Sequence, residues 1–356
     1  MTARVVGMRR RLTVATALAA LAVAGCGGGD DEREDAGARR DGGPGLGTAA
    51  APLPFPPQAF EPGQGGQPAD DLAGRIVRVG GRPEGVAVDP ETGLVAVGVK
   101  GPDALVLLDV RTGRIVRRVP LPSAPRHVQL AEPGGPFLVP AEATDELVEV
   151  SPRDGRTRST KVGDNPHDAT WRDGTAWTAD EFSSTVSEVR DGRTVRRRPV
   201  DVQPGGIVAL DDGTLAVVSV RAYTVELLDR NGRTLGSQNV GYGPSHLVAD
   251  RRGRLYVADT RGGGISVFDT RPRLRFAARL ALPGSPYGLA LDAGRDRLWV
   301  TRTARNEVAE IDISGRPRVL RTLPTLQQPN TVGVDSRTGT VVVASAASGQ
   351  VQLLSP

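Results

Sequence analysis

The chain contains three histidines, and they occur in closely similar sequence contexts. Each one follows a proline by one or two residues: His127, His167 and His246. Imidazole is the commonest metal ligand among side chains, and it titrates nearest neutrality, so a histidine can hold an ion or transfer a proton. Whether the three histidines act together depends on where the fold places them.

The prolines before the histidines belong to a longer series. A proline followed within three residues by a short apolar run occurs seven times, at intervals of 42, 41, 38, 40, 42 and 43 residues. In the first unit the apolar segments are residues 86–88, 94–97, 104–109 and 114–119. Short segments rich in Val, Leu and Ile, separated by Gly, Asp and Pro, predict strands joined by hairpins. The seven prolines are Pro83, Pro125, Pro166, Pro204, Pro244, Pro286 and Pro329.

Four strands per unit at a period near forty residues is typical of a β-propeller blade. The sequence therefore predicts an all-β fold, a seven-bladed propeller with four-stranded antiparallel blades. The last unit stops after residues 351–354, which form its third strand, whereas residues 75–79 form an unassigned strand ahead of the first unit. We expect this N-terminal strand to complete the last blade, because that pairing closes the ring and hides two sheet edges. Aspartates that end strands are expected to act as turn residues; they are Asp89, Asp109, Asp229, Asp250, Asp269, Asp292 and Asp335.

In such a ring, the loops before the first strands and the loops between the second and third strands meet on one face, around the axis. We expect a ligand-binding funnel there, lined by Glu84, Arg126, His127, His167, Asp168, His246, Tyr287, Asn330, Glu142, Asp180, Glu181 and Asp259. Within it, His127, His167, Asp168 and His246 are candidate ligands for one divalent ion. Two or three histidines with a carboxylate suit Zn, Mn or Fe, whereas mainly oxygen ligands suit Mg or Ca.

A plainer interpretation is that each histidine only hydrogen-bonds to backbone where its blade begins. The histidines come from units two, three and five, so His127 and His246 can share an ion only if the channel mouth is narrow.

The repeat pattern of residues 71–356 resembles the YVTN-repeat propellers, the YncE-like group of exported bacterial proteins, and residues 253–260 also resemble an NHL repeat. This architecture hosts binding platforms, lactonases, lyases and protein docking hubs. The chain is also similar to streptogramin lyases, seven-bladed propellers that use a histidine base beside a Mg ion. That resemblance implies a metal-assisted elimination or ring opening in which His246 or His127 removes a proton.

The N-terminal region carries a targeting pattern. Arg9, Arg10 and Arg11 precede an apolar run and then small residues, so residues 1–25 are predicted to be a signal peptide. The chain's single cysteine, Cys26, follows directly, and the arrangement resembles the lipobox of bacterial lipoproteins, in which this thiol is acylated. An ordinary secretory signal with an unpaired cysteine is the alternative. Residues 26–70, rich in Gly and Pro, are predicted to be a disordered tether.

Charge excludes one class of partner. The net charge of +4 comes from four arginines in the first 25 residues, and the remaining basic and acidic residues balance. An even charge balance with few aromatic residues argues against nucleic acid. We therefore expect a monomer, lipid-anchored on the extracytoplasmic side of the cell membrane, that serves as a binding platform for an envelope protein or small molecule. The alternatives are a metal-dependent lyase or lactonase with one divalent ion in the funnel, and a purely structural envelope protein.

Overall fold

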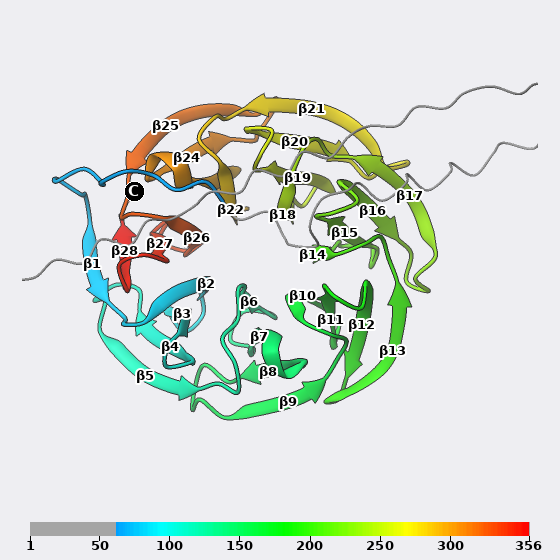
Figure 1. Ribbon diagram of the computed structural model, residues 1–356, viewed down its shortest axis with the longest axis horizontal. Helices are drawn as coiled ribbons and strands as arrows, with labels where there is room; N and C mark the ends of the chain where they lie inside the picture. The colour runs from blue at the N-terminus through cyan, green and yellow to red at the C-terminus, as the bar shows by residue number, and fades with distance from the viewer. Residues whose placement is uncertain (1–61, 356) are drawn as a thin grey trace, which may run out of the picture. The chain divides into compact units, whose positions relative to one another are not determined.

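The computed structural model describes residues 62–355 and shows seven four-stranded antiparallel sheets arranged in a ring (Figure 1). The predicted all-β, seven-bladed propeller is confirmed. Within each blade the first strand lies nearest the axis and the fourth forms the outer wall, as Figure 1 shows. The predicted signal peptide, Cys26 and most of the tether lie outside the described residues.

The first four blades follow one another along the chain. Blade 1 consists of β2 (Arg82–Asp89), β3 (Leu94–Lys100), β4 (Ala104–Asp109) and β5 (Ile115–Pro120). Blade 2 consists of β6 (Gln129–Leu130), β7 (Phe137–Ala141), β8 (Glu146–Val150) and β9 (Thr157–Lys161). Blade 3 consists of β10 (Pro166–Arg172), β11 (Thr175–Asp180), β12 (Thr185–Arg190) and β13 (Arg193–Pro199). Blade 4 consists of β14 (Pro204–Ala209), β15 (Leu215–Ser219), β16 (Thr224–Leu228) and β17 (Thr234–Asn239).

The last three blades complete the ring. Blade 5 consists of β18 (Pro244–Ala249), β19 (Arg254–Asp259), β20 (Gly264–Asp269) and β21 (Arg275–Ala281). Blade 6 consists of β22 (Pro286–Asp292), β23 (Arg297–Arg302), β24 (Glu307–Asp312) and β25 (Arg318–Pro324). Blade 7 consists of β26 (Pro329–Val334), β27 (Val341–Ser345), β28 (Gln350–Leu354) and β1 (Arg75–Arg78). Two short 3-10 helices, η1 (Glu142–Thr144) and η2 (Thr303–Arg305), lie between the second and third strands of blades 2 and 6.

The N-terminal strand closes the ring as predicted. β1 pairs with β28 in antiparallel register, with Arg75 opposite Leu353 and Arg78 opposite Gln350. Figure 1 shows β1 beside β28 at the outer side of blade 7. Two backbone N–H groups just after β1, those of Val79 and Gly80, also donate to the carbonyl of Gly349 at 3.0 and 2.9 Å. Blade 7 therefore has all four strands.

The hydrophobic core is divided among the interfaces between blades. The described residues form seven buried clusters, and each combines side chains from two neighbouring blades. Each sheet thus buries its faces against its neighbours, which is how a ring of small sheets excludes water. Among the described residues no helix is long and apolar enough to cross a membrane.

Six of the seven predicted aspartates act as turn residues, and the exception, Asp269, pairs instead with Arg254 and Arg275. Asp89 accepts hydrogen bonds from the Glu91 N–H and the Thr92 hydroxyl, and Asp229 accepts from the Asn231 and Arg233 N–H groups. Each carboxylate thereby satisfies backbone groups that its own tight turn leaves free.

Candidate functional site

A β-bulge aims the residues after the repeat proline toward the axis. In β10 the register shifts between Pro166 and Asp168, so that His167 is the extra residue opposite β11. In β18 the shift lies between Pro244 and Leu247 and places His246 in the bulge. An extra residue re-aims side chains that would otherwise point at the neighbouring blades. The bulges therefore convert two ordinary strand positions into positions that face the channel.

In blade 2 the histidine precedes the first strand instead of lying in a bulge. That first strand is short, so His127 lies in the segment just before it. The bulge of blade 1 comes very close to that segment at Gly85, which has φ +70°. A Cβ at Gly85 would lie 2.9 Å from the carbonyl carbon of His127. Glycine is needed here because only it tolerates both the left-handed conformation and the close approach.

The three histidines converge although they come from blades 2, 3 and 5. The ring centroids of His127 and His246 are 4.3 Å apart, those of His127 and His167 are 5.0 Å apart, and those of His167 and His246 are 6.4 Å apart. One potential ligand atom from each residue lies within 4.8 Å of the others. His167 and His246 are 2% and 6% exposed. Three imidazole nitrogens this close together could hold one metal ion.

Hydrogen bonding fixes how His246 presents its ring. Its Nδ1 lies 3.1 Å from the backbone carbonyl oxygen of Tyr287, which can only accept, so Nδ1 carries the proton. The Tyr287 ring meets the imidazole edge-on at a centroid distance of 4.4 Å. The lone pair of His246 is consequently on Nε2. A metal-ligating histidine is commonly held in this way, with one nitrogen donating to a carbonyl and the other free to coordinate.

Two carboxylates hold the opposite side of the cluster. The Nδ1 atom of His167 lies 3.4 Å from a Glu142 oxygen and 3.3 Å from a Glu181 oxygen. Glu181 is fixed in turn by the side-chain amides of Asn165 and Gln203, which donate to it at 3.0 and 2.9 Å. A carboxylate behind a histidine orients the ring and raises the basicity of the far nitrogen.

The electrostatics divide the cluster into one cationic and two neutral rings. Burial lowers the pKa of His167, but the hydrogen bonds and charges of Glu142 and Glu181 outweigh it and raise the pKa to about 10. Burial, followed by the nearby charge of His167, lowers the pKa of His246 to about 3. Burial also holds the pKa of His127 well below its usual range. His127 and His246 are therefore neutral near pH 7 and keep their lone pairs.

Several buried polar atoms in this cluster lack a hydrogen-bond partner. Among the described residues, His127 Nε2, His167 Nδ1 and one oxygen of Glu142 make no hydrogen bond of acceptable geometry. A buried polar atom without a partner costs about 1–3 kcal/mol, and native structures contain few of them. His167 Nδ1 and the Glu142 oxygen face each other at 3.4 Å, so His127 Nε2 is the atom of the three that has no polar neighbour of this kind. Together with the other two imidazoles it forms a donor set that fits a divalent transition-metal ion.

Two cavities lie near the cluster. His127, Asp168 and His246 line a small cavity of about 70 Å³, which is room for an ion and a few water molecules. A larger cavity of about 450 Å³, which we call the mouth, is lined by Glu84, Arg126 and Asn330 among others. The mouth lies beside the cluster, because Arg126 directly precedes His127 and is 3.6 Å from Glu142.

Three of the predicted funnel residues, Asp168, Asp180 and Asp259, already have other hydrogen-bond partners. Asp168 lines the small cavity, but its carboxylate accepts hydrogen bonds from the Gln129 amide and from the N–H groups of Ala169 and Ile207. Burial raises the pKa of Asp168 despite these bonds. The structure thus brings the three predicted histidines together and places Asp168 beside them with its oxygens already occupied.

Asp180 and Asp259 point into their own blades. The Asp180 carboxylate accepts hydrogen bonds from Thr178, Thr185 and Ser187. Asp259 accepts from the N–H groups of a nearby turn and pairs with Arg279 at 2.8 Å. Both side chains are fully buried, and neither lines the two cavities near the cluster.

Glu84, Asn330 and Arg126 form the rim of the mouth. The Asn330 amide donates to Glu84 at 3.0 Å and accepts from the Gln328 amide, also at 3.0 Å. Arg126 lies 3.6 Å from Glu142 and so links the rim to the carboxylate behind His167.

Sequence reasoning missed one wall of the mouth. Pro62 and Gln64 line it, although they fall in the stretch predicted to be a disordered tether. The Gly63 N–H donates to the Ser285 hydroxyl at 2.9 Å, and the Asn306 amide donates to the Gly66 carbonyl at 2.8 Å. Residues 62–66 carry no strand pattern, so the only available signal was the proline and glycine content that suggested a linker.

Comparisons with known proteins agree on the fold. No family model matches the chain, and no curated protein matches it. Among solved structures, hydrazine synthase of Kuenenia stuttgartiensis matches with TM-score 0.69 and 18% identity over 82% of this chain and 99% of that one. The β-propeller domain of Cps50 (Swd1) from Myceliophteria thermophila matches with TM-score 0.69 and 15% identity over 80% and 100%. A streptogramin B lyase matches with TM-score 0.66 and 14% identity over 78% and 97%. At these identities the likeness establishes the propeller architecture.

Proposed function

We propose that this chain is a metal-dependent enzyme of the lyase or lactonase type, anchored by a lipid on the extracytoplasmic side of the membrane. The observation that carries the proposal is the convergence of His127, His167 and His246 on one point, with the His127 Nε2 buried and unpartnered. The likeness to a streptogramin B lyase supports the choice of reaction class by analogy of fold.

His127 and His246 each keep a lone pair for an ion, and His167, which is cationic without one, would release its Nε2 proton when an ion binds. In His246 and His167 the Nδ1 atom faces a backbone carbonyl and two carboxylates respectively, which leaves Nε2 as the coordinating atom. Three histidines with an open fourth position are typical of catalytic zinc sites. We therefore expect Zn²⁺ or another first-row divalent ion rather than Mg²⁺, because Mg²⁺ prefers oxygen ligands.

The protein residues divide the remaining work. A bound ion of this kind polarises a substrate carbonyl and stabilises a developing oxyanion. His127 and His246 then act as ligands, so the proton acceptor must be another group. Glu142 is suited to that role because it lies between the cluster and the rim, 3.4 Å from His167 Nδ1 and 3.6 Å from Arg126 Nε. The rim residues Glu84 and Asn330 are placed to orient a polar substrate.

Metal content of the full chain tests the proposal. After exposure to Zn²⁺, Mn²⁺ or Fe²⁺ and dialysis, we expect about one equivalent of ion by mass spectrometry. The double variant His127→Gln/His246→Gln should lose it, whereas the control Glu84→Gln, on the rim, should keep it. Thermal melting of each variant shows that it is folded. A folded wild-type chain without bound ion, or equal binding in the double variant, would overturn the proposal. Bound ion would justify assays with lactones and cyclic depsipeptides.

The proposed location has its own test. Cys26 follows the small residues of the predicted signal peptide, so we expect the chain to fractionate with membranes. Cys26→Ser should release it into the extracytoplasmic soluble fraction. If the variant stays with the membrane, Cys26 is not the anchor.

A second candidate function, a docking platform, is favoured by an apolar group on the same face. Phe182, Val202 and Tyr242 are 59%, 49% and 74% exposed, and they occupy loops of three consecutive blades at the end where the histidines lie. Exposed apolar side chains that gather on one face are typical of interaction sites. Phe182→Ser/Tyr242→Ser should abolish binding to an envelope partner and leave metal content unchanged.

A further inference from the structure

The outer wall of the propeller carries charge of one sign. The seven outermost strands, β1, β5, β9, β13, β17, β21 and β25, contain fourteen arginines and lysines and not one aspartate or glutamate. The described chain as a whole is nearly balanced in charge, so its acidic residues must lie on other strands and loops. The sequence has nearly equal numbers of basic and acidic residues, but the fold places many of the basic ones on the outer strands and the acidic ones elsewhere.

Protection of the sheet edge does not explain this bias. Charged side chains on an edge strand discourage pairing with another chain, but acidic residues do so as well as basic ones. Pairing with carboxylates of the second and third strands explains part of it. In blades 5 and 6, Arg275, Arg279, Arg318 and Arg321 form ion pairs with Asp269, Asp259, Asp312 and Glu310 at 2.5, 2.8, 2.8 and 2.6 Å.

The unpaired cations lie on one side of the ring. Among the described residues no ion pair forms at Arg75, Arg78, Arg117, Arg118, Arg193 or Arg196, and all six are exposed. They belong to β1, β5 and β13, and β9 lies between the last two. Figure 1 shows β1, β5, β9 and β13 following one another around the wall of blades 7, 1, 2 and 3. We call these four strands the basic arc.

A repeated contact joins the strands of the arc. The stem of Arg75 lies against the turn glycine of blade 1, Gly113, where a Cβ would meet it at 2.7 Å. Arg117 lies in the same way against Gly155, and Arg158 against Gly192. The arginine stems thus bridge from each blade to the turn of the next. Basic side chains therefore follow one another from blade to blade, although Arg158 and Lys161 of β9 pair with Glu149 and Glu146.

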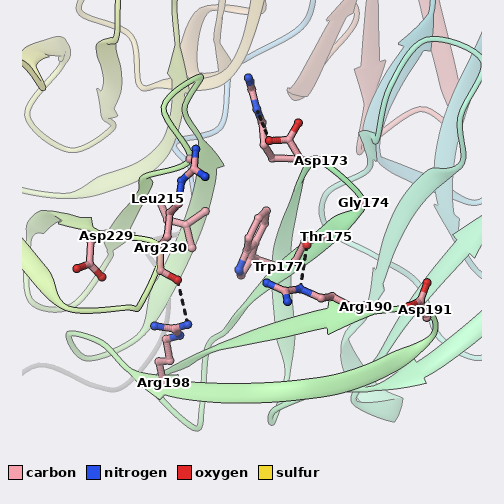
Figure 2. A pocket seen from close by; sticks show the side chains of 12 residues that line it. Asp173, Gly174, Thr175, Trp177, Arg190, Asp191, Arg198, Leu215, Asp229 and Arg230 are labelled. Atoms are coloured by element: carbon pink, nitrogen blue, oxygen red, sulfur yellow. Dashed lines mark hydrogen bonds and ion pairs between the residues drawn. The ribbon is translucent and has the colours of Figure 1, made fainter.

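The arc ends in a cleft between blades 3 and 4. This cleft, about 330 Å³ in volume, is lined by four arginines, three aspartates and Trp177. Figure 2 labels Trp177, Arg198 and Arg230 among them. Arg198 of β13 is 7% exposed there and has one terminal nitrogen without a hydrogen-bond partner, while the other pairs with Glu188 at 3.1 Å and donates to the Arg230 carbonyl at 3.2 Å. Arg230 makes no ion pair among the described residues and donates to the Asp212 carbonyl. The cleft adds guanidinium groups and an aromatic wall at the end of the arc.

We propose that the basic arc is the binding surface for a flexible, linear, anionic polymer, whose repeated phosphate or carboxylate groups contact successive blades. Charge complementarity supports an anionic partner, and the curvature of the wall decides its form. A flat membrane touches a curved wall along a narrow line, and a stiff duplex cannot follow it, whereas a flexible chain can follow four blades and enter the cleft. This surface is distinct from the axial histidine site.

Binding of linear polyphosphate tests the proposal. The full chain with Cys26→Ser, which prevents anchoring, is titrated with polyphosphate at several salt concentrations. The arc variant carries Arg78→Gln, Arg118→Gln, Arg193→Gln and Arg196→Gln. The matched control carries Arg273→Gln, Arg275→Gln, Arg316→Gln and Arg318→Gln on blades 5 and 6, and it loses the same number of positive charges. None of the arc substitutions removes an arginine that packs against a turn glycine, and melting curves verify folding.

The expected result is specific to the arc. The arc variant should bind polyphosphate about tenfold or more weakly, and its salt dependence should fall by about 3 in slope, since each contact contributes about 0.7 for a flexible strand. The control should bind like the wild type. Equal loss in both variants would overturn the proposal, because it would show attraction to net charge alone. Absence of polyphosphate binding would overturn it too. Tighter, arc-dependent binding to phosphatidylglycerol vesicles would replace the polymer by a membrane surface.

Discussion

Closure of the ring by the N-terminal strand can be tested at one side chain. Val79 directly follows β1 and is fully buried between blades 7 and 1, in a cluster with Val86, Val351 and Leu353. If β1 is an integral part of blade 7, Val79→Ala should be as costly as a substitution in any other interface between blades. If β1 were a loosely attached segment, the substitution would cost almost nothing.

The magnitude follows from what the substitution removes. Val→Ala deletes two buried carbon groups, each worth about 0.8 kcal/mol in transfer from water. The cavity left behind adds a further term of about 24 cal/mol per Å³ where the surroundings do not collapse. Together these give a loss of about 2–3 kcal/mol, a substantial part of the 5–15 kcal/mol by which a protein is ordinarily stable.

Urea unfolding of the full chain measures this loss as a shift in midpoint at constant slope. The matched control is Val195→Ala, the same substitution on outer strand β13, where the side chain is 52% exposed. We expect the control to change stability by less than about 0.5 kcal/mol. A Val79→Ala effect no larger than that of the control would refute ring closure by packing at β1.

Two other perturbations probe the same fold. Deletion of residues 71–80 should abolish cooperative unfolding in a urea titration, because it removes β1 and exposes the edge of β28 together with the apolar cluster between blades 7 and 1; a shortened chain that unfolds as sharply as the full one would contradict this. Asp312→Asn should lower the melting temperature at neutral pH, because hydrogen bonds from Ser314, followed by the charges of Arg318 and Arg297, lower the pKa of Asp312 from 3.8 to about 2. A depressed folded pKa means that the contribution is complete above the unfolded value and is lost as pH falls toward 2, so the gap between wild type and variant should narrow over that window; a gap independent of pH would count against it.

Period and composition predicted the fold well, for a physical reason. A propeller blade is a local unit, so its strands and turns are specified within about forty residues by apolar runs and by aspartates that complete their own turns. Closure of the ring could also be predicted. The last blade lacks its outer strand and an extra strand precedes the first blade, so pairing these two is the one arrangement that leaves no open sheet edge.

The details of the site could not be predicted to the same depth. The sequence placed all three histidines near the axis, but it gave no sign that Glu142 and Glu181 would lie behind His167 while Asp168 was taken up by backbone N–H groups. The directions in which these side chains point depend on the β-bulges. A bulge shifts the strand register by one residue, and the apolar periodicity of the sequence does not locate such a shift. The segregated charge of the outer wall was hidden likewise, because composition sums over strands that the fold separates.

The convergence of blades 2, 3 and 5 on one point depends on the residues that the other blades place at the axis. Blades 1, 4 and 6 have glycine at the position equivalent to the histidines of blades 2 and 5, namely Gly85, Gly206 and Gly288. A Cβ at Gly288 would come within 2.7 Å of the Asn330 carbonyl oxygen, and one at Gly206 within 2.8 Å of the Leu247 side chain. The inner strands have therefore closed in around these glycines, and that contraction allows imidazoles from blades 2 and 5 to approach to 4.3 Å. The repeat supplies seven equivalent positions around the axis. Imidazoles can gather there because blades 2 and 5 have histidine at this position, whereas blades 1, 4 and 6 have glycine.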